Sequence, residues 1–94
     1  MKQKDEALQN WRDQIDSLDT ELLRLLARRM DKVRHIGQYK SAHNLKPLSP
    51  KRQQAVLNRW LREAKNHDLP PEFVSQLYTL IHDHAIKLET EEKT

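Results

Sequence analysis

The sequence predicts an all-α fold of three helices with a long first helix, and two observations lead to this expectation. The chain of 94 residues contains one glycine and no cysteine, and 33% of its residues are charged. A β-sandwich or barrel needs repeated turn residues, which such a composition does not supply. Apolar residues recur instead at spacings of three and four, as on one face of a helix. The length fits a single domain over residues 1–94, with ends at about 1–4 and 90–94 that we expect to fray.

The first helix is expected from about Asp5 to about Ser41. Its apolar seam alternates spacings of three and four residues, as in a coiled coil, and comprises Leu8, Trp11, Ile15, Leu18, Leu22 and Leu25. Gly37 interrupts the later part of this pattern and costs about 1 kcal/mol relative to alanine in a helix interior. A glycine there can let another backbone or a ligand approach closely.

The length of this helix has a consequence for assembly. A straight helix of roughly 37 residues is about 55 Å long, whereas a compact chain of this size has a radius of gyration of about 12 Å. The apolar seam therefore needs a partner, most simply the same helix of a second chain. We expect an intertwined homodimer, and the alternative is a kink near Gly37 that folds the helix into a monomer.

Proline and capping residues mark the other two helices. Residues 42–50 contain two prolines and no periodicity, which indicates a loop. Ser49 and Pro50 suit the N-cap and first position of a second helix, which ends near His67. Pro71 can open a third helix. The apolar residues expected to face inward in the second helix are Val56, Leu57, Trp60, Leu61 and Ala64. The apolar face of the third helix comprises Phe73, Val74, Leu77, Leu80, Ile81, Ala85 and Leu88. The tail from Glu89 to Thr94 is expected to fray.

The composition also excludes several classes of function. Without cysteine there is no disulfide scaffold, cysteine-based zinc site or thiol nucleophile. No apolar run approaches 18 residues and the opening residues lack a signal-peptide core, so we expect a cytoplasmic protein without membrane contact. The net charge is only +3, because the 17 basic residues are dispersed among 14 acidic ones. This distribution favours a mixed-charge surface over nucleic-acid binding. His82 and His84 point in different directions on a helix, so no metal site is expected.

Two cationic residues, Arg29 and Lys40, lie on the seam face of the first helix, where the spacing predicts apolar residues. Arg29 follows Leu25 at the seam spacing, and a buried guanidinium there could grip a carboxylate with two hydrogen bonds. Alternatively, the seam rotates to Leu26 and Met30 and leaves Arg29 solvated. Lys40 shares the face of Arg29, about 16 Å further along the helix axis.

A third cation can join them only from another chain. Arg12 lies about 25 Å from Arg29 along the same helix, and about a quarter-turn around it. One small ligand cannot touch both residues of one straight helix. In an antiparallel dimer, however, Arg12 of one chain can reach the Arg29 and Lys40 of the other, which yields two equivalent sites per dimer.

The remaining helices add two charged residues of interest. Arg52 lies in the first turn of the second helix, where backbone N–H groups also favour an anion. Glu89 follows Ala85 by one turn, beside the apolar face of the third helix. Spacing alone favours Glu89 as a solvated residue of the tail.

These residues carry a resemblance to a known family. The pattern Arg-x-x-Ile-Asp-x-Leu-Asp from Arg12, the pair Arg28-Arg29 and the pattern Gly-x-x-Lys ending at Lys40 resemble the AroQ class of all-helical chorismate mutases. The likeness continues through Pro50-Lys51-Arg52 and covers nearly the whole chain. It implies a dimer of three-helix chains that rearranges chorismate, a small dianion, to prephenate, with no cofactor, no metal and no covalent intermediate.

The resemblance also implies roles for individual residues. Arg29 and Arg12 of the partner subunit would bind the two substrate carboxylates, and Lys40 would donate to the ether oxygen and to a carboxylate. Arg52 would add positive charge, and Glu89 would be the second donor to the ether oxygen. A pericyclic reaction needs orientation of the substrate and cations at the ether oxygen, not a nucleophile. Since a carboxyl group donates only when protonated, activity should fall as the pH rises.

Three positions depart from the family pattern. Gln53 and Ser49 stand where many members carry acids near the ring hydroxyl, and Ala85 stands where a small hydroxyl residue is common. The departures keep isochorismate-pyruvate lyase open as an alternative, because that branch shares the fold and the Arg, Arg and Lys pattern. Aminodeoxychorismate mutase is a further variant, which the loss of two carboxylates disfavours because an ammonium group would favour them. A non-catalytic helical binding module is the alternative outside the enzymes.

Overall fold

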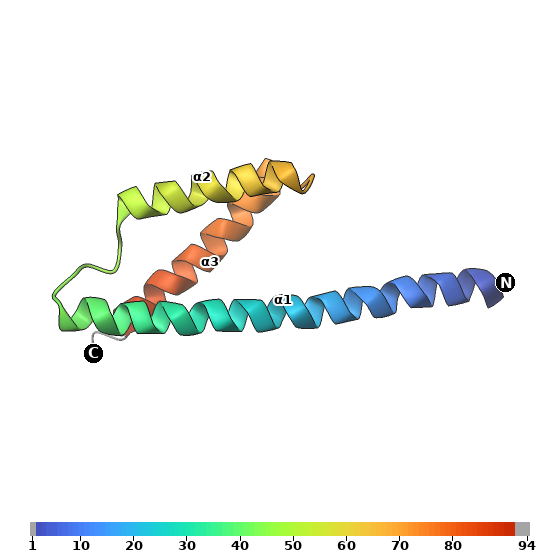
Figure 1. Ribbon diagram of the computed structural model, residues 1–94, viewed down its shortest axis with the longest axis horizontal. Helices are drawn as coiled ribbons and strands as arrows, with labels where there is room; N and C mark the ends of the chain where they lie inside the picture. The colour runs from blue at the N-terminus through green and yellow to red at the C-terminus, as the bar shows by residue number, and fades with distance from the viewer. Residues whose placement is uncertain (1, 92–94) are drawn as a thin grey trace. The chain divides into compact units, whose positions relative to one another are not determined.

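The computed structural model describes residues 2–91, with side chains from residue 5 onward, and contains three helices (Figure 1). They are α1 (Lys2–Ala42), α2 (Pro50–Asn66) and α3 (Pro71–Glu91), and no strand occurs within the described range. The prediction of an all-α, three-helix chain is confirmed. The homodimer and the single domain over residues 1–94 stay predictions. The chain divides into two compact units, Met1–Lys32 and Val33–Thr94, each of which is described by itself.

Helix α1 is slightly longer than the sequence predicts. It begins at Lys2, before the expected start at Asp5, and runs through Gly37 without interruption to Ala42. Gly37 is buried, as is Val33 one turn earlier. This burial agrees with the expectation that a residue without a side chain permits close approach here. The expected fraying at residue 1 and at residues 92–94 lies outside the described residues.

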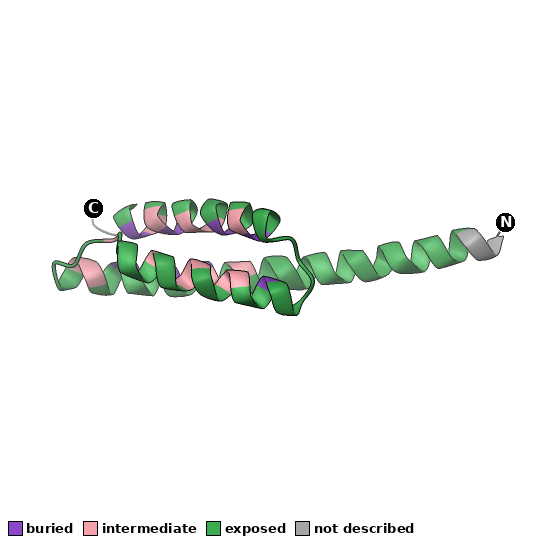
Figure 2. Ribbon diagram, turned by 90° about the horizontal axis from the view of Figure 1, so that it is seen from above, coloured by how far each residue is buried: buried purple, intermediate pink, exposed green. Residues whose placement is uncertain are grey.

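The first unit exposes its apolar seam. Every residue from Asp5 to Leu25 is exposed, as the green stretch of α1 in Figure 2 shows. Large side chains of the seam are among them, with Trp11 61% and Leu22 63% exposed. The seam of α1 is thus an apolar stripe that this single chain leaves exposed.

Helices α1 and α2 end in the same way, without glycine. At the end of α1, Leu45 N donates to Lys40 O at 2.8 Å, and Asn44 takes a left-handed conformation with φ of 58°. At the end of α2, Leu69 N donates to Ala64 O at 2.9 Å, and Asp68 has φ of 55°. Both are Schellman motifs, in which the left-handed residue is usually glycine and sometimes asparagine. Asparagine and aspartate tolerate this conformation better than most residues, which explains how a chain with one glycine turns twice.

The helix starts follow the sequence prediction. Ser49 is the N-cap of α2, and its hydroxyl accepts a hydrogen bond from Arg52 N at 3.3 Å. Pro50 occupies the first position of α2, where its missing N–H is no loss. Pro71 opens α3 in the same way, and Val74 N donates to Pro70 O at 3.1 Å. The start of each shorter helix is therefore fixed by local sequence.

The core of the second unit lies between α2 and α3, which pack against each other. Tyr78 is only 3% exposed, and its ring meets Trp60 of α2 edge-on with centroids 5.3 Å apart. Ala64, Val74 and Ala85 are also buried, and Figure 2 shows the buried residues along one side of α3. Of the predicted apolar face of α3, Val74 and Ala85 are buried and Ile81 and Leu88 are half-buried. Phe73, Leu77 and Leu80 are exposed on the single chain. The buried stripe of α3 includes Tyr78, which the predicted apolar face does not contain.

The end of α3 also differs from expectation. The sequence predicted a frayed tail from Glu89, but α3 continues to Glu91 and Glu89 is only 7% exposed. The solvated interpretation of Glu89 was therefore wrong, and the contact described below gives the physical reason. Within residues 2–91, no helix has the length and apolar character needed to cross a membrane.

Candidate active site

The second unit holds a lysine and a glutamate in direct contact. Lys40 Nζ lies 2.7 Å from Glu89 Oε1, and the two side chains are 22% and 9% exposed. Lys40 Nζ also donates a hydrogen bond to the backbone oxygen of Pro47 at 2.7 Å. The ammonium is thus held between the end of α1, the following loop and the end of α3.

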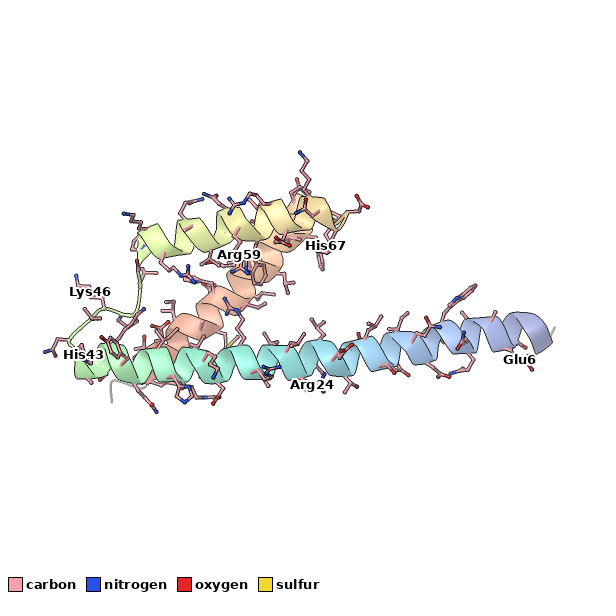
Figure 3. The ribbon with its side chains drawn as sticks, in the orientation of Figure 1. Glu6, Arg24, His43, Lys46, Arg59 and His67 are labelled. Carbon is pink, nitrogen blue, oxygen red and sulfur yellow. The ribbon has the colours of Figure 1, made fainter. Side chains whose placement is uncertain are left out.

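Local sequence places the Pro47 carbonyl beside Lys40, and α3 supplies Glu89. The Schellman turn after α1 reverses the chain, and the loop labelled at His43 and Lys46 in Figure 3 then brings the Pro47 carbonyl back to the lysine. Proline restricts the backbone around residue 47, which favours one loop path. Glu89 arrives from the last turns of α3, because its position continues the buried stripe through Ala85.

This arrangement can stabilise negative charge on a ligand. An ammonium has three N–H donors, and the two contacts seen in the described residues use two of them. Lys40 can therefore donate a third hydrogen bond while its position stays fixed. A partly buried, hydrogen-bonded cation interacts more strongly with an anion than a solvated one does, because water screens it less.

The first turn of α2 contributes three of the predicted site residues. Ser49 caps the helix with its hydroxyl, Gln53 N donates to Ser49 O at 2.9 Å, and Arg52 is exposed beside them. Gln53 is half-buried. The hydroxyl of Ser49 accepts from the backbone and still has its own proton to donate.

Helix α3 contributes Ala85 and Glu89, and also two polar residues that the sequence analysis did not assign to the site. The Tyr78 hydroxyl donates to the Gln53 backbone oxygen at 3.2 Å and lies 3.4 Å from Nδ1 of His82. The signal for them was present, since Tyr78, His82, Ala85 and Glu89 follow one another at spacings of four, three and four. Tyr78 was overlooked because it was not counted with the apolar face.

The remaining two predicted residues belong to the first unit. Arg12 is exposed, and Arg29 is half-buried next to the buried Met30. The Nη1 atom of Arg29 is shielded from solvent, so the alternative of a solvated guanidinium does not describe this residue. The structure brings together Lys40 and Glu89 directly, and Ser49, Arg52 and Gln53 in one helical turn. The roles of all these residues stay predictions.

One family of known proteins matches most of this chain. The family chorismate mutase type II matches residues 11–90. The T-protein of Enterobacter agglomerans is 38% identical over 66 residues, which cover 70% of this chain and 18% of that protein. The bifunctional chorismate mutase/prephenate dehydratase of Aquifex aeolicus is 33% identical over 87 residues, which cover 89% of this chain and 24% of that protein. This chain thus spans about a fifth to a quarter of the length of these two relatives.

A shorter relative matches over most of its own length. The 4-amino-4-deoxychorismate mutase of Streptomyces venezuelae is 35% identical over 82 residues, which cover 87% of this chain and 80% of that protein. The match over residues 11–90 includes all of α2, most of α1 and α3, and every residue that the sequence analysis assigned to the site. The chain belongs to the chorismate mutase type II family.

Proposed function

We propose that the chain catalyses the rearrangement of chorismate to prephenate. The observation that carries this proposal is the Lys40 ammonium, held by Glu89 and by the Pro47 carbonyl with a third donor to offer. In the reaction, the ether C–O bond breaks as a new C–C bond forms, and no nucleophile is needed. Catalysis then depends on orienting the substrate and on stabilising the charge that develops on the ether oxygen.

Lys40 is the proposed donor to the ether oxygen. Its two contacts fix the ammonium before the substrate arrives, so little reorganisation is needed as charge develops. Glu89 is the proposed second donor, which requires its protonated form.

The arginines are the proposed binding groups for the two carboxylates. A guanidinium matches a carboxylate with two parallel hydrogen bonds, which orients as well as binds. We assign this role to Arg29 and to Arg12 of the partner subunit. Arg52, Ser49 and Gln53 at the start of α2, together with the apolar Ala85, are the proposed surroundings of the substrate.

The partner is proposed to be a second copy of the chain. Each chain leaves the α1 seam exposed, and the second unit has an apolar groove of about 230 Å³ lined by Trp60, Ala64, Leu69, Phe73, Val74 and Leu77. Arg59 of α2 and His67, the residue that directly follows α2, border this groove and are labelled in Figure 3. A homodimer would cover apolar surfaces that one chain exposes to water. The proposed compartment remains the cytoplasm, because nothing in a cysteine-free chain requires an oxidising environment.

A paired assay tests the proposed activity. Purified protein is given chorismate, and prephenate formation is followed for wild type, Lys40→Ala and Lys46→Ala. We expect Lys40→Ala to lower kcat/KM by about a hundredfold or more, as for removal of a preorganised donor. Lys46 is an exposed lysine of the adjoining loop and serves as the matched control, with unchanged activity expected. A well-folded wild type that forms no prephenate would overturn the proposal.

A second candidate is the rearrangement of 4-amino-4-deoxychorismate, in which an amino group replaces the ring hydroxyl. The similarity to the Streptomyces venezuelae enzyme over 80% of that enzyme favours it. The same assay with the amino compound separates the two candidates by their kcat/KM values. Isochorismate in a third arm, with salicylate and pyruvate as products, tests the lyase alternative. A folded protein inactive in all arms would favour the binding module.

A further inference from the structure

A buried tyrosine connects α2 to a histidine of α3. The Tyr78 hydroxyl donates to the backbone oxygen of Gln53 at 3.2 Å and lies 3.4 Å from Nδ1 of His82. The Tyr78 and His82 rings are also stacked, with centroids 5.5 Å apart and planes at 19°. Tyr78 is 3% exposed, so this link between the start of α2 and the middle of α3 is shielded from water.

The two contacts of the Tyr78 hydroxyl allow its proton to be assigned. The Gln53 oxygen is the nearer of the two, at 3.2 Å against 3.4 Å for Nδ1 of His82, so we assign the single tyrosine proton to that oxygen. With this assignment, Nδ1 of His82 donates its N–H to the tyrosine oxygen. In a neutral imidazole with a proton on Nδ1, the other nitrogen, Nε2, is a hydrogen-bond acceptor.

The position of His82 places this acceptor on the face of α3 that carries the candidate site. His82, Ala85 and Glu89 follow at spacings of three and four, so they lie on one side of the helix within about 10 Å along its axis. At one end of this stretch Glu89 meets Lys40, and at the other Tyr78 meets Gln53. Between them, Ala85 offers no polar atom in its side chain, and half-buried His82 is the next polar side chain on this face.

We propose that His82 contacts the polar substituent on the ring of the substrate through Nε2 and thereby sets the preference between a hydroxyl and an amino group. Tyr78 is a positioning residue that holds the imidazole in this orientation. The inference rests on the proposed function, since it concerns how the same site recognises a dianion whose ring carries either substituent. It goes beyond that function by naming the residue that distinguishes the two substrates.

The two substrates should depend on His82 to different extents. A hydrogen bond between neutral groups contributes less than one to a charged group. Loss of the acceptor should therefore lower kcat/KM by about tenfold for a hydroxyl substrate and by about a hundredfold for an ammonium substrate. The ratio of the two kcat/KM values then shifts by about tenfold.

The experiment compares variants of the full chain with chorismate and with 4-amino-4-deoxychorismate. His82→Leu removes the acceptor, and His82→Gln restores a side-chain oxygen. Tyr78→Phe removes only the hydroxyl and keeps the ring beside Trp60. His84→Leu is the matched control, because His84 is an exposed histidine of the same helix. We expect the substrate ratio to shift in His82→Leu, to shift less in Tyr78→Phe, to recover in part in His82→Gln and to stay unchanged in His84→Leu.

Several outcomes would overturn the inference. With an active wild type, an unchanged substrate ratio in His82→Leu overturns it, and so do equal losses on both substrates accompanied by a lower melting temperature. If His82→Leu does not fold, unchanged ratios in His82→Gln and Tyr78→Phe overturn it. If wild type accepts one substrate only, unchanged kcat/KM for that substrate in His82→Leu overturns it. A wild type inactive on both substrates overturns the proposed function and this inference together.

Discussion

In the first unit, every side chain from Asp5 to Leu25 is exposed, whereas the second unit buries Val74, Tyr78 and Ala85. The first region is one helical segment with an apolar stripe, and an isolated helix in water gains little stability from its own backbone. The second region has two helices packed on each other and a fixed cation at its end. The difference is between an apolar surface that one region leaves exposed and charged groups that the other region holds in place.

The largest expected effect is on the exposed seam. Leu18→Asp would place a charge where the proposed dimer buries apolar surface, and an unpaired buried charge costs several kcal/mol. We expect the dimer to weaken by at least about a hundredfold, with loss of helicity and activity. Sedimentation velocity and circular dichroism measure these changes.

The neighbouring residue provides the control for the seam. Ser17 is exposed and lies off the seam, so Ser17→Asp adds the same charge without entering the proposed interface. It should leave the assembly unchanged. If Leu18→Asp and Ser17→Asp sediment alike, the seam is not an interface and the contrast between the units needs another explanation.

The second effect concerns the contact between Lys40 and Glu89 in the other unit. If Glu89 donates to the ether oxygen, only its protonated form is active, and kcat/KM should fall by up to about tenfold per pH unit on the alkaline side. Glu89→Gln donates at every pH through its amide. It should therefore flatten the profile between about pH 5 and 8 and exceed wild type at the alkaline end.

Two results would contradict this role for Glu89. A wild-type profile without any decline toward alkaline pH would show that the carboxyl does not act as a donor. A decline that persists unchanged in Glu89→Gln would assign the titration to another group. Exposed Glu91, altered to glutamine, is the matched control, and its profile should follow that of wild type.

The contrast between the units also explains what the sequence could predict. The helix starts at Pro50 and Pro71 followed from local residues, because capping and proline geometry act within one turn. The seam spacing likewise predicted a long first helix. The burial of Glu89 could not be read from its own helix, since it depends on Lys40, which is distant in the sequence.

The site shows the same division between local and long-range information. Lys40, Ser49, Arg52 and Gln53 were identified by spacing and resemblance, but the Pro47 carbonyl that holds the lysine was not. A backbone oxygen carries no signal in the side-chain pattern. The link from Tyr78 to Gln53 joins two helices and appears only when they are packed.

The smallest expected effect concerns the turn after α2 and its contribution to the stability of the second unit. Asp68 has φ of 55° at the end of α2, a conformation that costs most residues other than glycine about 1 kcal/mol. Asp68→Ala should lower the free energy of unfolding by about 1 kcal/mol, because alanine lacks the side chain that helps aspartate adopt this conformation. Asp68→Gly should match or slightly exceed wild type, since glycine adopts positive φ without strain. Denaturant unfolding measures both changes, with Asp83→Ala on the exposed side of α3 as the control. Equal stability of Asp68→Ala and Asp68→Gly would mean that the positive φ at residue 68 does not limit the stability of this unit.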